Sequence, residues 1–401
     1  MAERAEVVFV DGVRTPFGRA GEKGMYWGTR ADDLVVKAMI GLLERNPTLP
    51  GNRVDDVAIA ATTQTGDQGL TLGRTAALLA GLPKTVPGFA IDRMCAGAMT
   101  AVTTMGSAIG FGAYDVAIAG GVEHMGRHPM GFGADPNPRF LSERLVSEDA
   151  LVMGATAERI HDRFPAYTKE RSDRFALRSQ HKVAVAYESG QIQPDLIPVA
   201  TRSAAGWGLA TRDEAPRPET TMEGLSALRT PFRSHGRITA GNASGLNDGA
   251  AVCLLASGDA AKELGLGVKM TMVSFAFAGV EPEVMGLGPV PSTEKALRKA
   301  GLGITDIGLF ELNEAFAVQV ISFLDHFGID DEDPRVNEYG GAIAIGHPLA
   351  SSGVRLMTQL AHQFAAHPEV RYGLTAMCIG LGQGGTVIWE NPNHNKKAAK
   401  R

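Results

Sequence analysis

The chain has 401 residues, a length that predicts two or three domains rather than one small core. Hydrophobic residues make up 44% and charged residues 21%, and the formal net charge is -5 at pH 7. A mildly acidic chain lacks the basic surface of a nucleic-acid-binding protein, so the composition disfavours that class of partner. Local basic side chains and backbone N–H groups would have to hold any phosphate-bearing ligand.

The N-terminal segment predicts neither export nor membrane insertion. Its apolar run VVFV at 7–10 has charged residues on both sides and is shorter than a signal-peptide core or a membrane span. Later apolar stretches contain charged or turn residues before they reach membrane length, so we expect no membrane span. The cysteines, Cys95, Cys253 and Cys378, form an odd, sparse set that suits a reducing compartment. We therefore expect a cytoplasmic protein.

Short apolar segments rich in β-branched residues predict strands buried on both faces, at 7–10, 57–61, 116–120 and 250–256. Amphipathic segments lie between them, at 31–45 and 71–80, with apolar residues at helical spacing. This alternation of strands and helices indicates an α/β fold.

The C-terminal part of the chain repeats this style. Strands are predicted at 268–278, 307–312, 373–379 and 385–389, and helices at 292–300, 315–327 and 351–364. Each part has a turn that leads into a helix of small residues, CAGA at 95–98 and PLASSG at 348–353. Each then returns through an apolar strand into a glycine pair, at 120–121 and 384–385. We interpret this shared layout as an internal duplication.

Residues 124–246 differ from the rest of the chain, because they are richer in Pro, Arg and Met. One clear helix is predicted near 169–189, ending before Gly190. We interpret the segment as an inserted subdomain. The predicted division is therefore an N-terminal half at 1–123, completed by about 247–267, an insert at 124–246 and a C-terminal half at 268–401.

Cys95 is a candidate nucleophile. It stands in IDRMCAGAMTAV, where an apolar strand meets a helix of small residues that lets a ligand approach the backbone. A thiol at a helix N-terminus feels the positive end of the helix dipole, which lowers its pKa from about 8.5. The competing interpretation is a core residue, which is the commoner place for an isolated cysteine among apolar neighbours.

His347 is a candidate general base. It lies in NEYGGAIAIGHPLASSG between Gly346 and Pro348, and the proline fixes the backbone at a position that suits the first turn of a helix. Such a rigid mount fits a base, whose ring has to reach its proton partner at hydrogen-bonding distance. A single histidine is also compatible with a purely structural role.

Cys378 ends a predicted strand and runs into the glycines of GLGQGG at 380–385. These glycines satisfy G-x-G-x-x-G formally, but a strand and then the end of the chain follow them, so the dinucleotide-binding interpretation fails. Glycines here would instead bring backbone N–H groups next to a reacting carbonyl, where a donor to a developing oxyanion contributes on the order of 3 kcal/mol.

Other polar residues have weaker signals. Asn313 in ELNEAFAVQV lies at a strand-to-helix junction, where it is either functional or the cap of a helix beginning near Ala315. His124 and His128 have the spacing of a metal pair, but no carboxylate or cysteine at a supporting spacing completes a site, so we expect no metal. Cys253, within AAVCLLAS, is expected in the core.

Taken together, these segments resemble the thiolase family. Residues 337–353 resemble its GHP motif, 376–385 its C-terminal cysteine-and-glycine motif, and NEAFA at 313–317 its asparagine motif. RTPFG at 14–18 and TAGNASGLNDGAA at 239–251 extend the likeness over nearly the whole chain. The nucleophile segment departs from the family, which usually has asparagine where this chain has Asp92, and small hydroxylated or glycine residues where it has Ala96, Gly97 and Ala98.

The resemblance implies two similar α/β halves in an α-β-α-β-α arrangement, with the inserted loop domain covering coenzyme A. It also implies that Cys95 attacks the 3-keto carbon of a 3-ketoacyl-CoA with His347 as its base. Cys378 would protonate the departing acetyl-CoA enolate, whose oxyanion His347 and a water held by Asn313 would stabilise. In the second half-reaction a CoA thiol would attack acyl-Cys95, with the backbone N–H groups of Cys95 and Gly380 binding the oxyanion.

The resemblance further implies contacts to CoA and the acyl chain, at Ser244, Arg217, Met153, Phe232, Met285 and Phe316. Coenzyme A would be a co-substrate, with no tightly bound cofactor. The expected partners are CoA and acyl-CoA thioesters, a homodimer or homotetramer, and a multifunctional β-oxidation subunit.

The type of thiolase is argued from three segments, VEHMGRHPMGFG, RPETTMEGLSALRTPF and EPEVMGLGPVP, which look closer to bacterial fatty-acid-oxidation thiolases. We therefore favour degradative 3-ketoacyl-CoA thiolysis. The alternatives are an acetyl-CoA acetyltransferase acting on acetoacetyl-CoA, with branched or steroid-derived acyl groups left open, and, from another class, a catalytically silent CoA-binding subunit.

Overall fold

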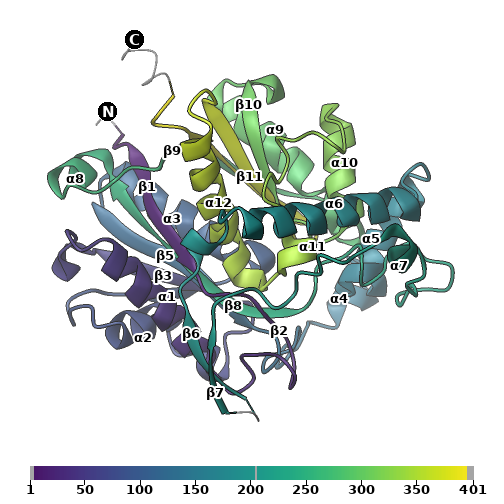
Figure 1. The fold of residues 1–401 in the computed structure, drawn as a ribbon, viewed down its shortest axis with the longest axis horizontal. Helices are drawn as coiled ribbons and strands as arrows, with labels where there is room; N and C mark the ends of the chain where they lie inside the picture. The colour runs from purple at the N-terminus through teal and green to yellow at the C-terminus, as the bar shows by residue number, and fades with distance from the viewer. Residues whose placement is uncertain (1–3, 204–205, 395–401) are drawn as a thin grey trace.

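The structure is a computed structural model that describes residues 4–203 and 206–394 (Figure 1). Its strands are β1 (Val7–Arg14), β2 (Gly18–Arg19), β3 (Asp56–Ala60), β4 (Phe89–Ile91), β5 (Val116–His124), β6 (Val199–Ser203), β7 (Gly206–Ala210), β8 (Asn247–Ser257), β9 (Met270–Gly279), β10 (Ile307–Leu312), β11 (Tyr372–Ile379) and β12 (Gln383–Glu390). Its α-helices are α1 (Ala31–Arg45), α2 (Leu72–Leu79), α3 (Gly97–Phe111), α4 (Arg139–Ser142), α5 (Met153–Arg163), α6 (Lys169–Glu188), α7 (Met222–Ser226), α8 (Gly258–Glu263), α9 (Pro289–Ala300), α10 (Ala317–Phe327), α11 (Ala342–Ile345) and α12 (Ser352–Ala366). Short 3-10 turns at the site are η2 (Gly66–Gln68), η3 (Met94–Ala96) and η8 (Leu349–Ser351).

The strands of the two halves follow the same pairing scheme. Along the main sheet the order is β10-β11-β12-β9-β1-β8-β5-β3-β4, with β2 beside β8. In the N-terminal half β3 is parallel to β5, β5 antiparallel to β8, and β8 antiparallel to β1. In the C-terminal half β10 is parallel to β11, β11 antiparallel to β12, and β12 antiparallel to β9. The predicted pair of similar α/β halves is confirmed.

Helices α3 and α12 form the layer between the two halves of the sheet. Their buried apolar residues share one cluster with inward-facing residues of both halves, including Met99, Val354 and Val387. A helix that is covered on both sides has to be apolar all round, which explains the Ala, Met and Val content of α3. Small residues allow the two helices to approach closely, since a Cβ placed on Gly353 would lie 2.6 Å from the backbone nitrogen of Met99.

The outer layers complete the arrangement. Helices α1 and α2 cover the outer face of the N-terminal half, with Leu34 and Ala76 in the same cluster as Val57 of β3. Helices α9 and α10 cover the outer face of the C-terminal half, with Leu297 and Val320 in a second cluster. The layers therefore run α-β-α-β-α, as the resemblance implied.

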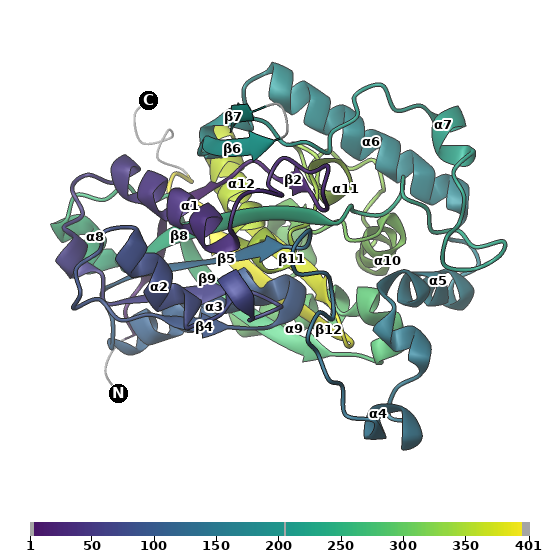
Figure 2. The same cartoon turned by 90° about the horizontal axis from the view of Figure 1, so that it is seen from below.

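The segment between β5 and β8 contains α4 to α7 and the β6–β7 hairpin. The predicted helix at 169–189 is confirmed as α6, which crosses the front of the C-terminal half in Figure 1 and packs against α10 and α11. Thr168 caps it by accepting a hydrogen bond from the backbone nitrogen of Arg171. In Figure 2, α4 lies at the end of a loop that leads away from the sheets. The division of the chain at 123 and 246 stays a prediction.

One stretch of the described residues, Met94–Phe111, has the length and hydropathy of a membrane span. The stretch contains Gly97, Gly106 and Gly110, which the sequence analysis counted as turn residues, so it does not contradict that prediction. These glycines continue the helix, because α3 packs between sheets where small residues are needed. Of this stretch 67% is buried inside the protein, so packing between the sheets accounts for its apolar composition.

Candidate active site

Cys95 is displayed by a tight turn between β4 and α3. The residue before it, Met94, has a left-handed backbone conformation with φ of 45°. The side chain of Asp92 stabilises this turn, because its Oδ1 accepts the backbone N–H of Met94 at 2.6 Å. Cys95 follows within η3, directly before the first residue of α3. The predicted placement at a helix N-terminus is confirmed.

The resting thiol of Cys95 is protonated. Burial raises its pKa to about 11. The N–H groups of Gly380 and of Cys95 itself oppose this shift, whereas the charges of Glu123 and Asp92 add to it. The predicted lowering of this pKa by the helix dipole is therefore wrong, because desolvation outweighs the nearby N–H groups. A base is needed to make the thiolate.

The backbone of His347 is fixed between α11 and η8. Its N–H donates to Oδ1 of Asn247 at 3.0 Å, and the Asn247 amide donates to the carbonyl of Gly18 at 2.9 Å. Gly346, which precedes the histidine, has φ of 109°, a conformation that favours glycine. A Cβ at Gly346 would also lie 2.5 Å from the Asn247 side chain. This close approach explains the glycine and confirms the predicted rigid mount.

The imidazole of His347 is held at both nitrogens. Nδ1 lies 2.6 Å from the hydroxyl of Ser352, which donates to the carbonyl of Pro348 at 3.0 Å. Because the hydroxyl has one hydrogen, Nδ1 is the donor to Ser352 and Nε2 carries the lone pair. Burial, with a smaller effect of the Arg355 charge, lowers the pKa of His347 to about 3. The ring is therefore neutral and its Nε2 is able to accept a proton.

Asn313 lies directly after β10, where it faces the histidine. Its backbone N–H donates to the carbonyl of Ala376 at 2.9 Å, and its Nδ2 lies 3.2 Å from Nε2 of His347. The interpretation of Asn313 as a helix cap is wrong, since α10 begins at Ala317 and Phe316 occupies the cap position. In the described part of the chain, the buried Oδ1 of Asn313 has no hydrogen-bond partner.

Cys378 and Gly380 lie at the end of β11. Cys378 is fully buried and pairs with Gly384 of the neighbouring strand β12. Burial raises the pKa of its thiol well above the ordinary value, and the negative charge of a Cys95 thiolate would raise it further, so the two thiols are electrostatic neighbours. The backbone N–H of Gly380 lies against the Cys95 thiol.

Packing joins the His347 turn to the Cys95 helix. A Cβ placed on Gly97, two residues after the nucleophile, would lie 3.1 Å from Cβ of Ala350, three residues after the base. The carbonyl to which Asn313 donates belongs to Ala376 of β11, the strand that ends at Cys378. A thiol, a neutral imidazole, a second thiol and converging N–H donors therefore meet at one place, an arrangement that suits acyl transfer through a covalent intermediate.

The chain matches the models of two protein domains, which together cover almost its full length. Residues 7–259 match "Thiolase, N-terminal domain" and residues 266–391 match "Thiolase, C-terminal domain". The chain belongs to the thiolase family. The 3-ketoacyl-CoA thiolase of Photobacterium profundum is 43% identical over 387 residues, which cover 96% of this chain and 99% of that protein. The β-ketoadipyl-CoA thiolase of Escherichia coli is 42% identical over 401 residues, with 96% and 99% covered.

Solved thiolase structures agree with this fold. Human mitochondrial 3-ketoacyl-CoA thiolase has a TM-score of 0.87 and 32% identity, covering 97% of this chain and 100% of that one. The Bacillus anthracis acetyl-CoA acetyltransferase has a TM-score of 0.87 and 33% identity, with 98% and 100% covered. The α-β-α-β-α fold of this family member is thus established independently of its motifs.

The predicted acyl-chain contacts gather around α5 of this thiolase. A Cβ on Gly380 would lie 3.7 Å from Sδ of Met153, the first residue of α5. The ring of Phe232 packs against the next residue, Gly154, which has no room for a side chain. Met285 and Phe316 belong to the apolar cluster that contains Cys378, and Met153 packs against this cluster. The assignment of these four side chains to the acyl chain stays a prediction.

The two predicted polar contacts are placed differently. The backbone N–H and the hydroxyl of Ser244 both donate to the carbonyl of Ala315, at 3.0 and 3.3 Å, which ties Ser244 to the segment that follows Asn313. Arg217 lies on the exposed surface of the insert, where its backbone N–H donates to Oε1 of Gln180 at 2.8 Å. Nothing in the described ranges connects Arg217 to the catalytic turns, and its role stays a prediction.

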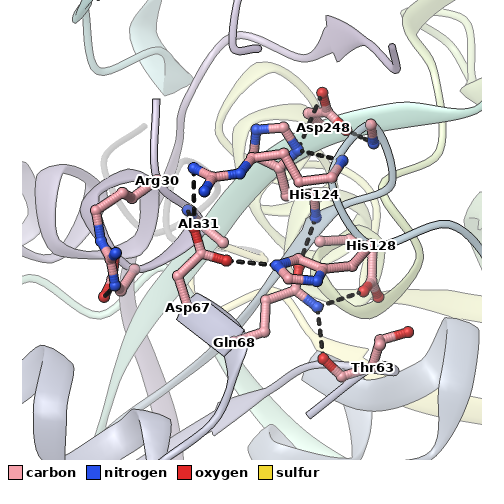
Figure 3. Close-up of polar contacts among 12 residues, drawn as sticks. Arg30, Ala31, Thr63, Asp67, Gln68, His124, His128 and Asp248 are labelled. Carbon is pink, nitrogen blue, oxygen red and sulfur yellow. Dashed lines mark hydrogen bonds and ion pairs between the residues drawn. The ribbon is translucent and has the colours of Figure 1, made fainter. Parts of the chain in front are cut away.

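His124 and His128 have structural partners (Figure 3). Nε2 of His124 lies 2.9 Å from the carbonyl of Tyr26, and the ring of His128 is paired with Asp67. Among residues 4–203 and 206–394 no group of His, Cys, Asp and Glu has the geometry of a metal site. Cys253 is fully buried in the cluster between the sheets, as predicted.

Three positioning residues were absent from the sequence prediction. Ser352 orients the His347 ring, Asn247 holds its backbone, and the left-handed turn at Met94 presents Cys95. Ser352 lay within a predicted motif, but nothing distinguished it from Ser351. The role of Asn247 depends on a contact between residues 100 positions apart, which the sequence does not show.

Proposed function

We propose that this chain is a 3-ketoacyl-CoA thiolase, which cleaves 3-ketoacyl-CoA with coenzyme A to acetyl-CoA and a shortened acyl-CoA through an acyl-Cys95 intermediate. The observation that carries the proposal is the meeting of Cys95, His347 and Cys378 within a thiolase fold. Relatives named 3-ketoacyl-CoA thiolase, 42–43% identical over 96% of the chain, support this choice of activity.

The first half-reaction needs proton transfer away from Cys95. Because the thiol pKa is about 11 and the His347 pKa is about 3, a free ion pair is unfavourable at rest. We expect the proton to move to Nε2 of His347 as sulfur attacks the 3-keto carbon, when the negative charge passes to the substrate oxygen. The C2–C3 bond then breaks, and Cys378, protonated at neutral pH, supplies the proton to C2 of the acetyl-CoA enolate.

The second half-reaction transfers the acyl group from Cys95 to coenzyme A. The first half-reaction leaves Cys378 as a thiolate and His347 protonated. The Cys378 thiolate takes the proton from the CoA thiol, whose sulfur attacks the thioester carbon, and the departing Cys95 sulfur takes back the proton from His347. The N–H groups of Cys95 and Gly380, which already face the Cys95 sulfur, are suited to bind the tetrahedral oxyanion. Asn313 has a free carbonyl oxygen beside His347 and is suited to hold the water that stabilises the enolate oxygen.

The acyl chain length is proposed from the surroundings of Gly380. Met94 and Met153 both lie over this residue, and methionine side chains adapt to flexible apolar chains. This environment favours substrates longer than acetoacetyl-CoA. The resemblance to the acetyl-CoA acetyltransferase of B. anthracis keeps the short-chain reaction as the competing function. We also propose that the enzyme is a cytoplasmic homo-oligomer that works together with other β-oxidation enzymes.

The decisive experiment compares CoA-dependent thiolysis of acetoacetyl-CoA with that of a medium-chain and a long-chain 3-ketoacyl-CoA, with Cys95→Ala as the control. Faster turnover of the longer substrates, abolished in Cys95→Ala, is the expected result. Activity confined to acetoacetyl-CoA would instead assign the acetyltransferase function.

A catalytically silent subunit is tested separately by mass spectrometry. After mixing with acetyl-CoA, we expect a mass increase of one acetyl group on the peptide that contains Cys95. The absence of this adduct, together with no thiolysis of any chain length, would contradict the enzyme proposal.

A further inference from the structure

Glu123 is a buried carboxylate that the catalytic proposal does not use. It lies one residue before the end of β5 and is 0% exposed. Its Oε2 accepts the backbone N–H groups of Thr62 and Ala350, both at 3.2 Å, and its Oε1 accepts Nε2 of Gln68 at 3.0 Å. No ion pair to Glu123 is present in the described ranges. Burial raises the pKa of its carboxyl group, and the hydrogen bonds from Thr62, Gln68 and Ala350 oppose that shift.

One of these donors belongs to the turn that carries His347. Ala350 is the middle residue of η8, which begins two residues after the histidine. Its Cβ packs on Gly97 of the nucleophile helix, and its carbonyl lies against Gly121 of β5, where no side chain would fit. The Glu123 carboxylate therefore binds the base-bearing turn at the point where that turn touches the Cys95 helix.

The carboxylate itself is held by a second layer of contacts (Figure 3). Gln68, which donates to Glu123, also donates to the carbonyl of Thr63 at 2.9 Å and accepts the backbone N–H of His124 at 2.7 Å. The neighbouring Asp67 pairs with His128 and accepts the backbone N–H of Ala31 at 3.2 Å. Glu123 is thereby prevented from rotating away from Ala350.

We propose that Glu123 is a positioning residue for thiolysis, which fixes the His347 turn against the Cys95 helix through its hydrogen bond with the backbone N–H of Ala350. The inference rests on the proposed thiolase function. It also gives the VEHMGRH segment a role other than metal binding. The backbone of His124 contacts Gln68, which donates to Glu123, and His128 is paired with the neighbouring Asp67.

The electrostatics give this role a measurable signature. The negative charge of Glu123 is one of the causes that raise the pKa of Cys95. Removing the charge therefore changes the reactivity of the Cys95 thiol as well as the alignment of His347. The alkylation of Cys95 therefore reports the charge of Glu123, and the split between kcat and KM reports the alignment of His347.

Glu123→Gln is the main test. The amide keeps the shape but places an NH2 group against at least one of the three N–H donors, so the turn at Ala350 is displaced. We expect kcat for thiolysis to fall by about tenfold to a hundredfold, because proton transfer requires hydrogen-bonding alignment, while KM for CoA changes less than about twofold. We also expect alkylation of Cys95 by iodoacetamide at about pH 8 to become faster, because a charge that raises the thiol pKa is removed.

Asp55→Asn is the matched control. Asp55 also accepts backbone N–H groups at β5, from Asp115 at 2.7 Å and Val116 at 3.0 Å, but at the opposite end of the strand. This variant is expected to keep the kcat and the alkylation profile of the wild type.

Three outcomes decide the inference. A folded Glu123→Gln protein with wild-type kcat and alkylation profile would overturn it. If that variant does not fold, Gln68→Leu removes one donor to Glu123, and an unchanged kcat in this variant would also overturn it. No thiolysis by the wild-type protein would contradict the proposed function instead, and alkylation of Cys95 would still report whether Glu123 acts on the thiol.

Discussion

Nδ1 of His347 lies 2.6 Å from the hydroxyl oxygen of Ser352, and this contact determines which nitrogen of the ring is free. The Ser352 hydroxyl donates to the carbonyl of Pro348, so it receives the hydrogen on Nδ1. Nε2 is left with the lone pair that a base needs. The orientation of the catalytic ring therefore depends on Ser352, a residue to which the proposed reaction gives no step of its own.

Ser352→Ala is expected to lower kcat by about tenfold to a hundredfold, because the ring loses the partner that selects its tautomer. KM for CoA should change less than about twofold, since the Ser352 hydroxyl is buried against His347 and Pro348. Steady-state thiolysis measures both constants.

Ser351→Ala is the matched control for this change. Ser351 is equally buried, and its hydroxyl also donates to the carbonyl of Pro348, at 2.9 Å, but it makes no contact with the ring. Its kcat should stay within about twofold of the wild type. Equal losses in the two serine variants would contradict the orienting role.

The reactivity of Cys95 in the free enzyme should rise with pH across the whole neutral range. Its pKa is raised to about 11, so the thiolate is a minor species below that pH and its fraction increases about tenfold per pH unit. Iodoacetamide alkylation measured from about pH 6.5 to about pH 9.5, with Cys95→Ser to assign the modified residue, should show no plateau. A plateau near the ordinary thiol pKa of about 8.5 would show that N–H donors outweigh desolvation.

The burial of Cys95 also shows which property of this residue the sequence does not predict. Cys95 was located correctly because a cysteine between a strand and a helix of small residues is a local pattern. Its pKa was predicted in the wrong direction, because β11 and the His347 turn, which exclude water from the thiol, come from the other half of the chain. The local sequence indicates the dipole of the helix after Cys95, but it does not indicate how far the folded chain removes the thiol from water.

A similar difference separates the helices from the polar contacts. The segments of α1, α6 and α12 were predicted within a few residues, since apolar spacing determines which face of a helix is buried. Asn313 was compatible with a helix cap, but the tertiary bridge between Ala243 and Phe316 moves the start of α10 to Ala317. The partner of His128 is Asp67, 61 residues away, so no spacing rule indicates it.

Aspartate at position 92, where the family usually has asparagine, should differ from asparagine in its effect on Cys95 only through its charge. Asparagine retains the Oδ1 that accepts the Met94 N–H at 2.6 Å, so Asp92→Asn keeps the left-handed turn. It removes one of the negative charges that raise the pKa of Cys95. We expect alkylation of Cys95 at about pH 8 to become about threefold faster at low salt, with an unchanged melting temperature.

Asp92→Ala separates the charge from the turn. It removes both the charge and the hydrogen bond, so its melting temperature should fall while that of Asp92→Asn does not. A slower alkylation in Asp92→Asn would show that the carboxylate assists the thiol and would contradict the electrostatic assignment.

Gly380→Ala should impair long substrates more than short ones. The backbone of Gly380 does not have the left-handed conformation that requires glycine, so alanine keeps its N–H in place. The new Cβ would lie 2.6 Å from Sδ of Met94, which has to move toward the space that we assign to the acyl chain. We expect kcat/KM to fall about tenfold for a medium-chain 3-ketoacyl-CoA, as overpacking costs about 1–3 kcal/mol, and about twofold for acetoacetyl-CoA.

Gly279→Ala serves as the control for Gly380→Ala, because its Cβ would meet only the carbonyl of Gly382 at 3.8 Å. The double variant Met94→Ala with Gly380→Ala removes the clashing side chain and should recover medium-chain activity. If Gly380→Ala instead slows both substrates equally and Met94→Ala does not relieve the loss, the damage lies at the Gly380 N–H. The methionines would then not define the acyl site, whereas the assignment of Gly380 as an oxyanion donor would be strengthened.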